Sequence, residues 1–96
     1  MNKRMVVATT DKDRRGVFFG EYVSGDTKTG IVKLKNAKMC VYWSPATKGV
    51  LGLASIGPQN GSKLTPTIKE IEINGVTSIM DCDDVAVQQW EKELWG

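Results

Sequence analysis

The sequence has 96 residues, of which 41% are hydrophobic and 25% are charged, and its net charge at pH 7 is +2. These values are those of an ordinary globular protein and indicate neither a disordered chain nor a membrane protein, since no apolar run approaches the ~20 residues that span a bilayer. We expect a single domain over residues 1–96, with a thin core, because only about 60–65% of the unfolded surface of so short a chain can be buried.

Four segments of the first half have the composition of β-strands. They are rich in β-branched and aromatic residues and comprise residues 5–9, 16–23, 31–35 and 39–43. Within the third segment, lysines alternate with Val32 and Leu34, which predicts a strand with one face in water. Polar residues predict turns or breaks between the strands, at residues 10–13, 24–30 and 36–38. Glycines in the second segment permit a bend or bulge.

The middle of the chain is irregular. Pro45 ends the fourth strand, because proline cannot donate to a strand ladder. Residues 49–56 fit a helix of one or two turns and a buried extended segment equally well, and their glycines argue against a long helix. Residues 57–62 have the composition of a loop.

A hairpin is predicted next. Residues 68–73 and 76–80 have strand composition, and Asn74-Gly75 between them is a dipeptide typical of hairpin turns. This pattern predicts two adjacent antiparallel strands.

The C-terminal segment predicts a helix over residues 83–94. Asp83 is placed to cap it, and Val87, Trp90 and Leu94 recur at helical spacing, so we expect them to pack on the sheet. The expected fold is therefore α+β, a small curled antiparallel β-sheet or barrel-like sheet with one C-terminal helix.

The residue types present argue against an enzyme. Histidine, the commonest general base, is absent, and no nucleophile elbow, phosphate loop or dinucleotide fingerprint occurs. Asp81, Asp83 and Asp84 are better explained by helix capping than by acid–base catalysis. Cys40 and Cys82 are expected to be buried thiols, and they do not make a four-ligand zinc site. We expect no catalytic residues, no metal and no cofactor.

The charge is divided between the two halves. Residues 1–50 carry a balance of +6 and residues 51–96 a balance of −4. A basic front half is compatible with an anionic ligand, and solvated strand faces that the acidic half complements explain it slightly better.

A ligand site can be assembled from arginine, aromatic and glycine-loop residues. Arginine and lysine bind phosphate, aromatic faces stack on bases, and a glycine-rich loop lets backbone amides approach an anion. Each group also has a structural explanation, as turn charges, core aromatics or a simple connection. Alternation places Tyr42 on the same face as Cys40 and Trp43 on the other. The candidate ligand-binding residues are Arg14, Arg15, Tyr42, Trp43, Lys48, Gly57, Gln59, Asn60 and Lys63.

Several motifs together resemble a family of small proteins of unknown function that tailed phages and prophages encode. They are Arg15-Gly16-Val17-Phe18-Phe19-Gly20-Glu21, the segment from Asn36-Ala37 through Cys40-Val41-Tyr42-Trp43-Ser44, residues 49–58, Gly75-Val76-Thr77-Ser78 and residues 87–90. The resemblance implies phage origin and a host-cytoplasm setting, and it carries no catalytic roles. The N-terminus agrees with that setting, because only four apolar residues follow Arg4, too few for a signal peptide.

Residues 5–36 are also similar in layout to Sm-like RNA-binding domains. The likeness implies a small curled sheet that oligomerises. The chain departs from that pattern by lacking the N-terminal helix and the characteristic asparagine before the third strand.

These observations favour a phage accessory protein that binds without catalysis, capturing an anionic nucleotide-type signal of host defence. An Sm-like nucleic-acid-binding module and an inhibitor of a host protein are the alternatives. We also expect a homo-oligomer, because short sheets leave edge strands for a neighbour to cover.

Overall fold

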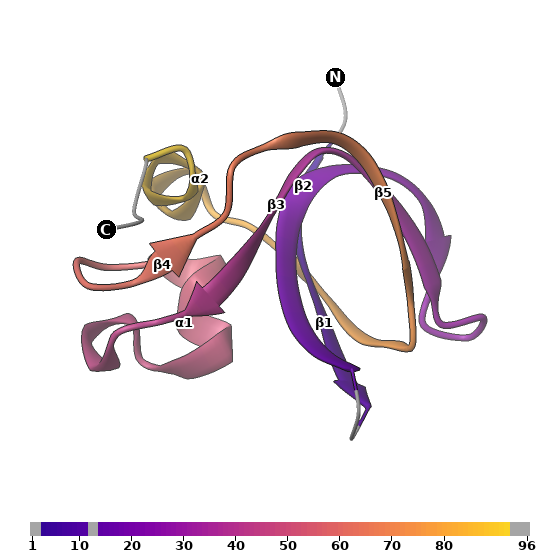
Figure 1. The fold of residues 1–96 in the computed structure, drawn as a ribbon, viewed down its shortest axis with the longest axis horizontal. Coiled ribbons are helices and arrows are strands. Elements are labelled where there is room, and N and C mark those ends of the chain that lie inside the picture. The colour runs from indigo at the N-terminus through magenta and orange to yellow at the C-terminus, as the bar shows by residue number, and fades with distance from the viewer. Residues whose placement is uncertain (1–2, 12–13, 93–96) are drawn as a thin grey trace.

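A computed structural model describes residues 3–11 and 14–92, and for residues 10, 11, 14 and 15 it describes the backbone alone. Six strands form one antiparallel sheet with the order β4-β3-β2-β1-β6, and β5 also pairs with β3 (Figure 1). The strands are β1 (Arg4–Asp11), β2 (Arg14–Asp26), β3 (Ile31–Tyr42), β4 (Lys63–Leu64), β5 (Ile68–Asn74) and β6 (Val76–Asp81). The helices are the 3-10 turn η1 (Pro45–Thr47), α1 (Gly49–Ser55) and α2 (Asp84–Trp90).

The expected small α+β fold with an antiparallel sheet is confirmed, with two differences. Residues 49–56, for which a helix and an extended segment were equally compatible with the sequence, contain the helix α1. The sheet therefore carries two α-helices rather than one. The sheet curls strongly, yet within the described residues no ladder joins β5 to β6 and the curl does not close into a barrel. No helix in the same part of the chain is long and apolar enough to cross a membrane.

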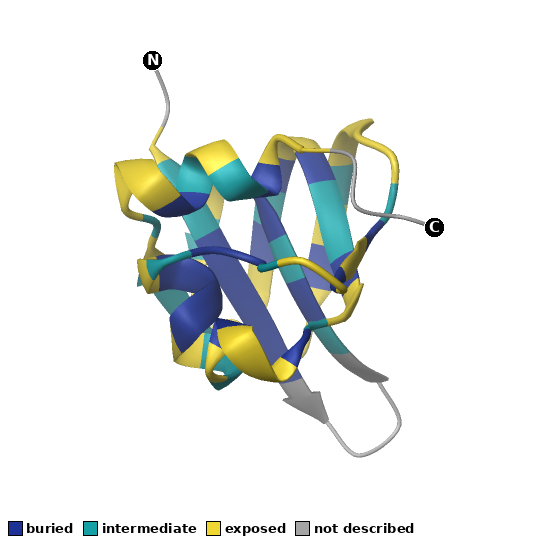
Figure 2. Ribbon diagram, turned by 90° about the vertical axis from the view of Figure 1, so that its left-hand side faces the viewer, coloured by how far each residue is buried: buried dark blue, intermediate teal, exposed yellow. Residues whose placement is uncertain are grey.

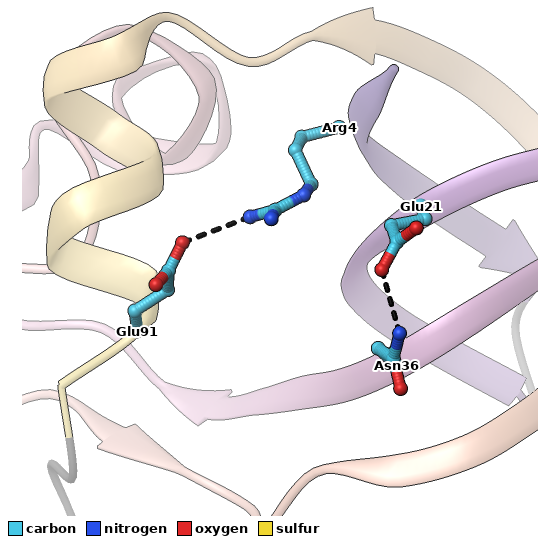
Figure 3. Close-up of polar contacts among 4 residues, drawn as sticks. All are labelled: Arg4, Glu21, Asn36 and Glu91. Atoms are coloured by element: carbon cyan, nitrogen blue, oxygen red, sulfur yellow. Dashed lines mark hydrogen bonds and ion pairs between the residues drawn. The ribbon is translucent and has the colours of Figure 1, made fainter. Parts of the chain in front are cut away.

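The break predicted at residues 36–38 is wrong, because β3 runs through it as a bulge. Phe19 pairs with Lys38 and Glu21 with Lys35, so two steps along β2 match three along β3. The positive φ of Asn36, 49°, lies at this extra residue, and its side-chain amide donates to Glu21 across the strands (Figure 3). A bulge increases the local twist and bends the strand, which is how this sheet curls.

The predicted hairpin at Asn74-Gly75 is also wrong. β5 pairs with β3, whereas β6 pairs with β1 at the other side of the sheet. Gly75, with φ of 78°, makes a corner between them, and the Val76 amide donates to the Gly30 carbonyl at 2.9 Å. A local turn signal specifies a change of direction and not the partner of each strand. Ile73 and Val76, on either side of the corner, are buried in the same core cluster.

Two core clusters lie on opposite faces of the curled sheet. Val7, Val32 and Leu34 lie in the cluster inside the curl, while Val6 and Phe19 lie in the other, beneath the helices. The neighbours Val6 and Val7 point to opposite faces, as strand geometry requires. Both helices cover the same side of the sheet (Figure 2).

Helix α2 is held by its buried tryptophan. Trp90 is fully buried and Val87 packs at the margin of the same cluster, as the spacing predicted, whereas Leu94 lies outside the described residues. Asp83 occupies the N-cap position without a side-chain capping bond. An ion pair of 2.8 Å from Arg4 of β1 to Glu91 adds a surface contact to the end of the helix (Figure 3).

Candidate functional site

The end of β3 carries a half-exposed tyrosine opposite a lysine. β3 leaves β2 after the Phe18–Met39 pair and continues beside β4, so that Cys40 faces Leu64 and Tyr42 faces Lys63. Tyr42 is 50% exposed and Lys63 is exposed. Side chains of directly opposite residues are neighbours in an antiparallel pair. An aromatic residue and a lysine are therefore paired across the two strands at this end of the molecule.

The predicted facing of Tyr42 and Trp43 is reversed. Trp43 packs against the core cluster that holds Cys40, and Tyr42 points into solvent. The register shifts between Cys40 and Tyr42, which interrupts the alternation on which the prediction relied. Trp43 consequently anchors the strand end, and Tyr42 is the aromatic ring that a ligand can reach.

Three buried hydroxyl groups fix the segments around this tyrosine. Ser44, Thr47 and Ser62 come from the end of β3, from η1 and from the loop before β4, and their oxygens lie 3.4–3.5 Å apart. The Ser62 hydroxyl also accepts a hydrogen bond from the backbone amide of Ser44 at 3.0 Å, and the Thr47 hydroxyl accepts one from the backbone amide of Gln59 at 3.1 Å. Buried polar groups that are all satisfied hold a structure rigidly. The loop is thus tied to η1 and to the end of β3.

Gly57 and Gln59 of this loop are occupied by internal contacts. Gly57 has φ of 84°, and a Cβ placed on it would lie 2.6 Å from Cβ of Gln89 in α2. Its amide donates to the Gly52 carbonyl, and the Gln59 side chain donates to the carbonyls of Ile56 and Gly57. Glycine here lets the loop approach α2 closely.

Lys48 and Asn60 are exposed at the same end. Lys48 directly follows Thr47 and has the left-handed φ of 64°, which turns the chain from η1 into α1. Asn60 follows Gln59 in the loop. Lys48 is next in sequence to Thr47, and Asn60 lies two residues before Ser62, so the hydroxyl contacts of Thr47 and Ser62 link the segments of both residues to the end of β3.

Arg14 and Arg15 begin β2, where their backbones pair with Asp11 and Thr10, and their side chains lie outside the described part. β3 turns away from the start of β2 on its way to β4, so this hairpin end and the Tyr42 end diverge (Figure 1). Of the candidate residues, the structure places Tyr42, Lys48, Asn60 and Lys63 on connected segments at one end of the molecule. Arg14 and Arg15 begin β2 at the other, diverging end.

The uneven charge of the two halves is partly neutralised within the fold. All three ion pairs of the described residues join a base of the first half to an acid of the second: Lys3 with Asp81, Arg4 with Glu91 and Lys33 with Glu70. Exposed pairs of this kind contribute little stability. They show that part of the basic half complements the acidic half directly.

The two thiols are shielded. Burial raises the pKa of Cys40 to about 11, and burial together with the nearby Asp83 carboxylate raises the pKa of Cys82 to about 12. Both are protonated at neutral pH, whereas a thiol nucleophile needs a lowered pKa. No group of three or more side chains suited to a metal ion occurs within residues 3–11 and 14–92.

An apolar groove elsewhere was missed by the sequence analysis. Phe18 of β2, Met39 of β3 and Ile68 and Ile71 of β5 line a cavity of about 330 Å³. These residues come from three strands that are well separated in sequence, and they meet only because the sheet curls. The strand composition of each was visible in the sequence, but no local signal could have shown the cavity.

Together these features define a small α+β protein with a curled antiparallel sheet and a rigid, polar end that displays an aromatic ring and two lysines. The chain belongs to the family described as Domain of unknown function (DUF6948), whose model matches residues 3–90. No curated protein and no solved structure gives a significant match. The match confirms membership of a family of unknown function, and the phage origin and the Sm-like relation remain proposals.

Proposed function

We propose that this protein binds an anionic, ring-bearing small molecule without transforming it, and that the site is the end of the sheet formed by Tyr42, Lys48, Asn60 and Lys63. The observation that carries the proposal is the half-exposed ring of Tyr42 directly opposite Lys63. In the phage setting that the sequence resemblance implies, the ligand is a nucleotide-type signal of host defence in the host cytoplasm.

The chemistry of these side chains suits a nucleotide. A base stacked on an exposed aromatic ring contributes about 1–3 kcal/mol. Lysine ammonium groups bind phosphate as point charges, and an asparagine amide both donates to and accepts from a base edge. The hydroxyl contacts between η1 and the loop support the proposal, because a site that is already rigid loses little entropy on binding.

Binding without catalysis is part of the same proposal. The raised pKa values of both thiols argue against a cysteine nucleophile, and the sequence has no histidine to act as a base. A protein that captures a signal molecule must bind it tightly and be present in sufficient amount, and it needs no catalytic group.

The proposal is tested by thermal melting of the purified protein with mononucleotides, dinucleotides and cyclic dinucleotides, and with single-stranded RNA. A nucleotide that raises the melting temperature at low and at moderate salt supports it, because few charges engage a small ligand. A response to RNA alone that falls steeply with salt would replace it with nucleic-acid binding. Silence toward both would favour the inhibitor of a host protein.

We also propose that the chain forms a homo-oligomer through the edge of β6 that lies away from β1. Within residues 3–11 and 14–92, β1 is the strand that pairs with β6, and the single charged residue of β6 is the terminal Asp81. Two copies of β6 can therefore pair in antiparallel fashion without placing like charges opposite each other.

A further inference from the structure

Two adjoining cavities run along one edge of β5. The larger, about 330 Å³, has apolar walls that include Met39, Pro66 and Ile68. The smaller, about 270 Å³, reaches the β1–β2 hairpin at Thr9 and Gly16. Both cavities share Phe18 of β2 and Ile71 of β5, so they form one groove between β2 and β5.

The groove borders the edge of β5 as well as its inner face. Ile71 and Ile73 belong to the core cluster inside the curl, and alternate residues of a strand point to opposite faces. The smaller cavity also borders Glu72 and Asn74, so it extends past the inner face to the edge of the strand. β5 pairs with β3 at its other edge, and within residues 3–11 and 14–92 no backbone hydrogen bond joins the groove edge to another segment.

We propose that this groove, which is separate from the nucleotide site, binds an extended peptide segment of a partner protein that adds to the sheet as a strand beside β5. In such binding the main chain supplies hydrogen bonds and alternate side chains enter pockets. The apolar cavity receives an aliphatic or aromatic side chain between Phe18 and Ile68. The seven residues of β5 accommodate a peptide of roughly equal length, at about 3.3 Å per residue.

A second copy of β5 does not fit the same edge. A two-fold axis pairs identical strands in antiparallel fashion and keeps their inner faces on the same side. In every such register that overlaps five or more residues, a glutamate lies opposite a glutamate: Glu70 with Glu72, Glu70 with Glu70, or Glu72 with Glu72. Like charges directly opposite destabilise a strand pair. The edge therefore selects a strand of different sequence.

Lys38, which borders the larger cavity, already has an interaction partner, so Glu72 at the smaller cavity is the charge that a basic residue of the partner can pair with. Glu70 is engaged with Lys33 at 3.2 Å, whereas Glu72 borders the groove and forms no ion pair among the described residues. A lysine or arginine of the incoming strand, placed between its apolar residues, can pair with Glu72. The expected segment alternates apolar with basic residues.

Four synthetic heptapeptides test this inference, each alternating lysine with isoleucine, leucine, valine or phenylalanine and blocked at both ends. Titration into the isotopically labelled protein is followed by amide chemical shifts. We expect at least one peptide to bind with Kd below 1 mM and to shift the amides of residues 71–74. N-methylation of the peptide amides that face β5 should lower the affinity of that peptide at least ten-fold. N-methylation of the amides along the opposite edge of the peptide should lower it much less.

Two protein variants provide matched controls. Ile68→Lys places a charge in the apolar groove at a residue that is 47% exposed, and it should weaken binding at least ten-fold. Leu51→Lys, on α1 and 72% exposed, should leave binding unchanged. If Ile68→Lys does not fold, Glu72→Lys tests the charge, with an expected loss of several-fold.

Four outcomes would overturn the inference. These are the absence of binding by all four peptides at 1 mM, equal affinity of both N-methylated forms, shifts centred on Tyr42, and dissociation of an oligomer when peptide is added. The last would show that a second copy occupies the edge. Nucleotide binding by the Ile68→Lys variant separates this inference from the proposed function, because the two sites share no residue.

Discussion

Trp90 of α2 lies flat on Phe19 of β2, with ring centroids 5.0 Å apart and an angle of 7° between the rings. The indole NH donates to the Leu53 carbonyl of α1 at 2.8 Å. One side chain thus joins both helices to the sheet, and the helices frame the rigid end that carries the proposed site.

Truncation of this residue should be strongly destabilising. We expect Trp90→Ala to lower the free energy of unfolding by about 3–5 kcal/mol, since it removes a fully buried ring. Trp90→Phe keeps a stacked ring and leaves the Leu53 carbonyl unpaired, for a loss of about 1–3 kcal/mol. Chemical denaturation measures both, and an unchanged midpoint for the alanine variant would contradict the packing described.

Gly57 should resist substitution more than another glycine of similar backbone angle. Gly57→Ala combines an unfavourable left-handed conformation, about 1–2 kcal/mol, with a clash against α2 of about 1–3 kcal/mol. Gly75→Ala has a φ of 78° and open space, so it should show the conformational cost alone. Equal melting temperatures for the two variants would argue against close contact between the loop and α2.

The thiols should make stability fall at alkaline pH. Their pKa values in the fold, about 11 and about 12, exceed the ordinary value near 8.5, so the unfolded chain loses these protons first. The contribution is complete below pH ~8.5 and is lost as the pH rises toward 11. Denaturation between pH 8 and 10.5 should show a steeper decline for the natural protein than for a Cys40→Ala, Cys82→Ala variant. Parallel declines would contradict the shielding.

Light scattering tests the proposed self-association. At micromolar concentration we expect a mass that is a multiple of 10.6 kDa. A monomeric mass for the natural protein would remove the proposal.

The sequence predicted what local pattern determines. The alternation of Val32 and Leu34 located a strand, and the spacing of Val87 and Trp90 located the helix and its buried ring. Pairing is not local, so Asn74-Gly75 suggested a hairpin whose two strands lie at different sides of the sheet.

The candidate site shows the same limit. Tyr42, Lys48 and Lys63 were identified from their chemistry, but the hydroxyl contacts of Thr47 join three separate segments and have no signature in sequence. The reversal of Tyr42 and Trp43 follows from a register shift that only the pairing with β4 creates.

Calorimetric titration of the tightest nucleotide from the melting panel tests the central claim most directly, with three variants beside the natural protein. Tyr42→Leu removes the stacking ring and should weaken binding about ten-fold or more, and Lys48→Gln should cost about 1.5–3 kcal/mol through a lost charge-assisted contact. Lys28→Gln, in the exposed turn after β2, should bind as the natural protein does. Unchanged affinity in both Tyr42→Leu and Lys48→Gln, or no heat of binding with any nucleotide, would contradict the account.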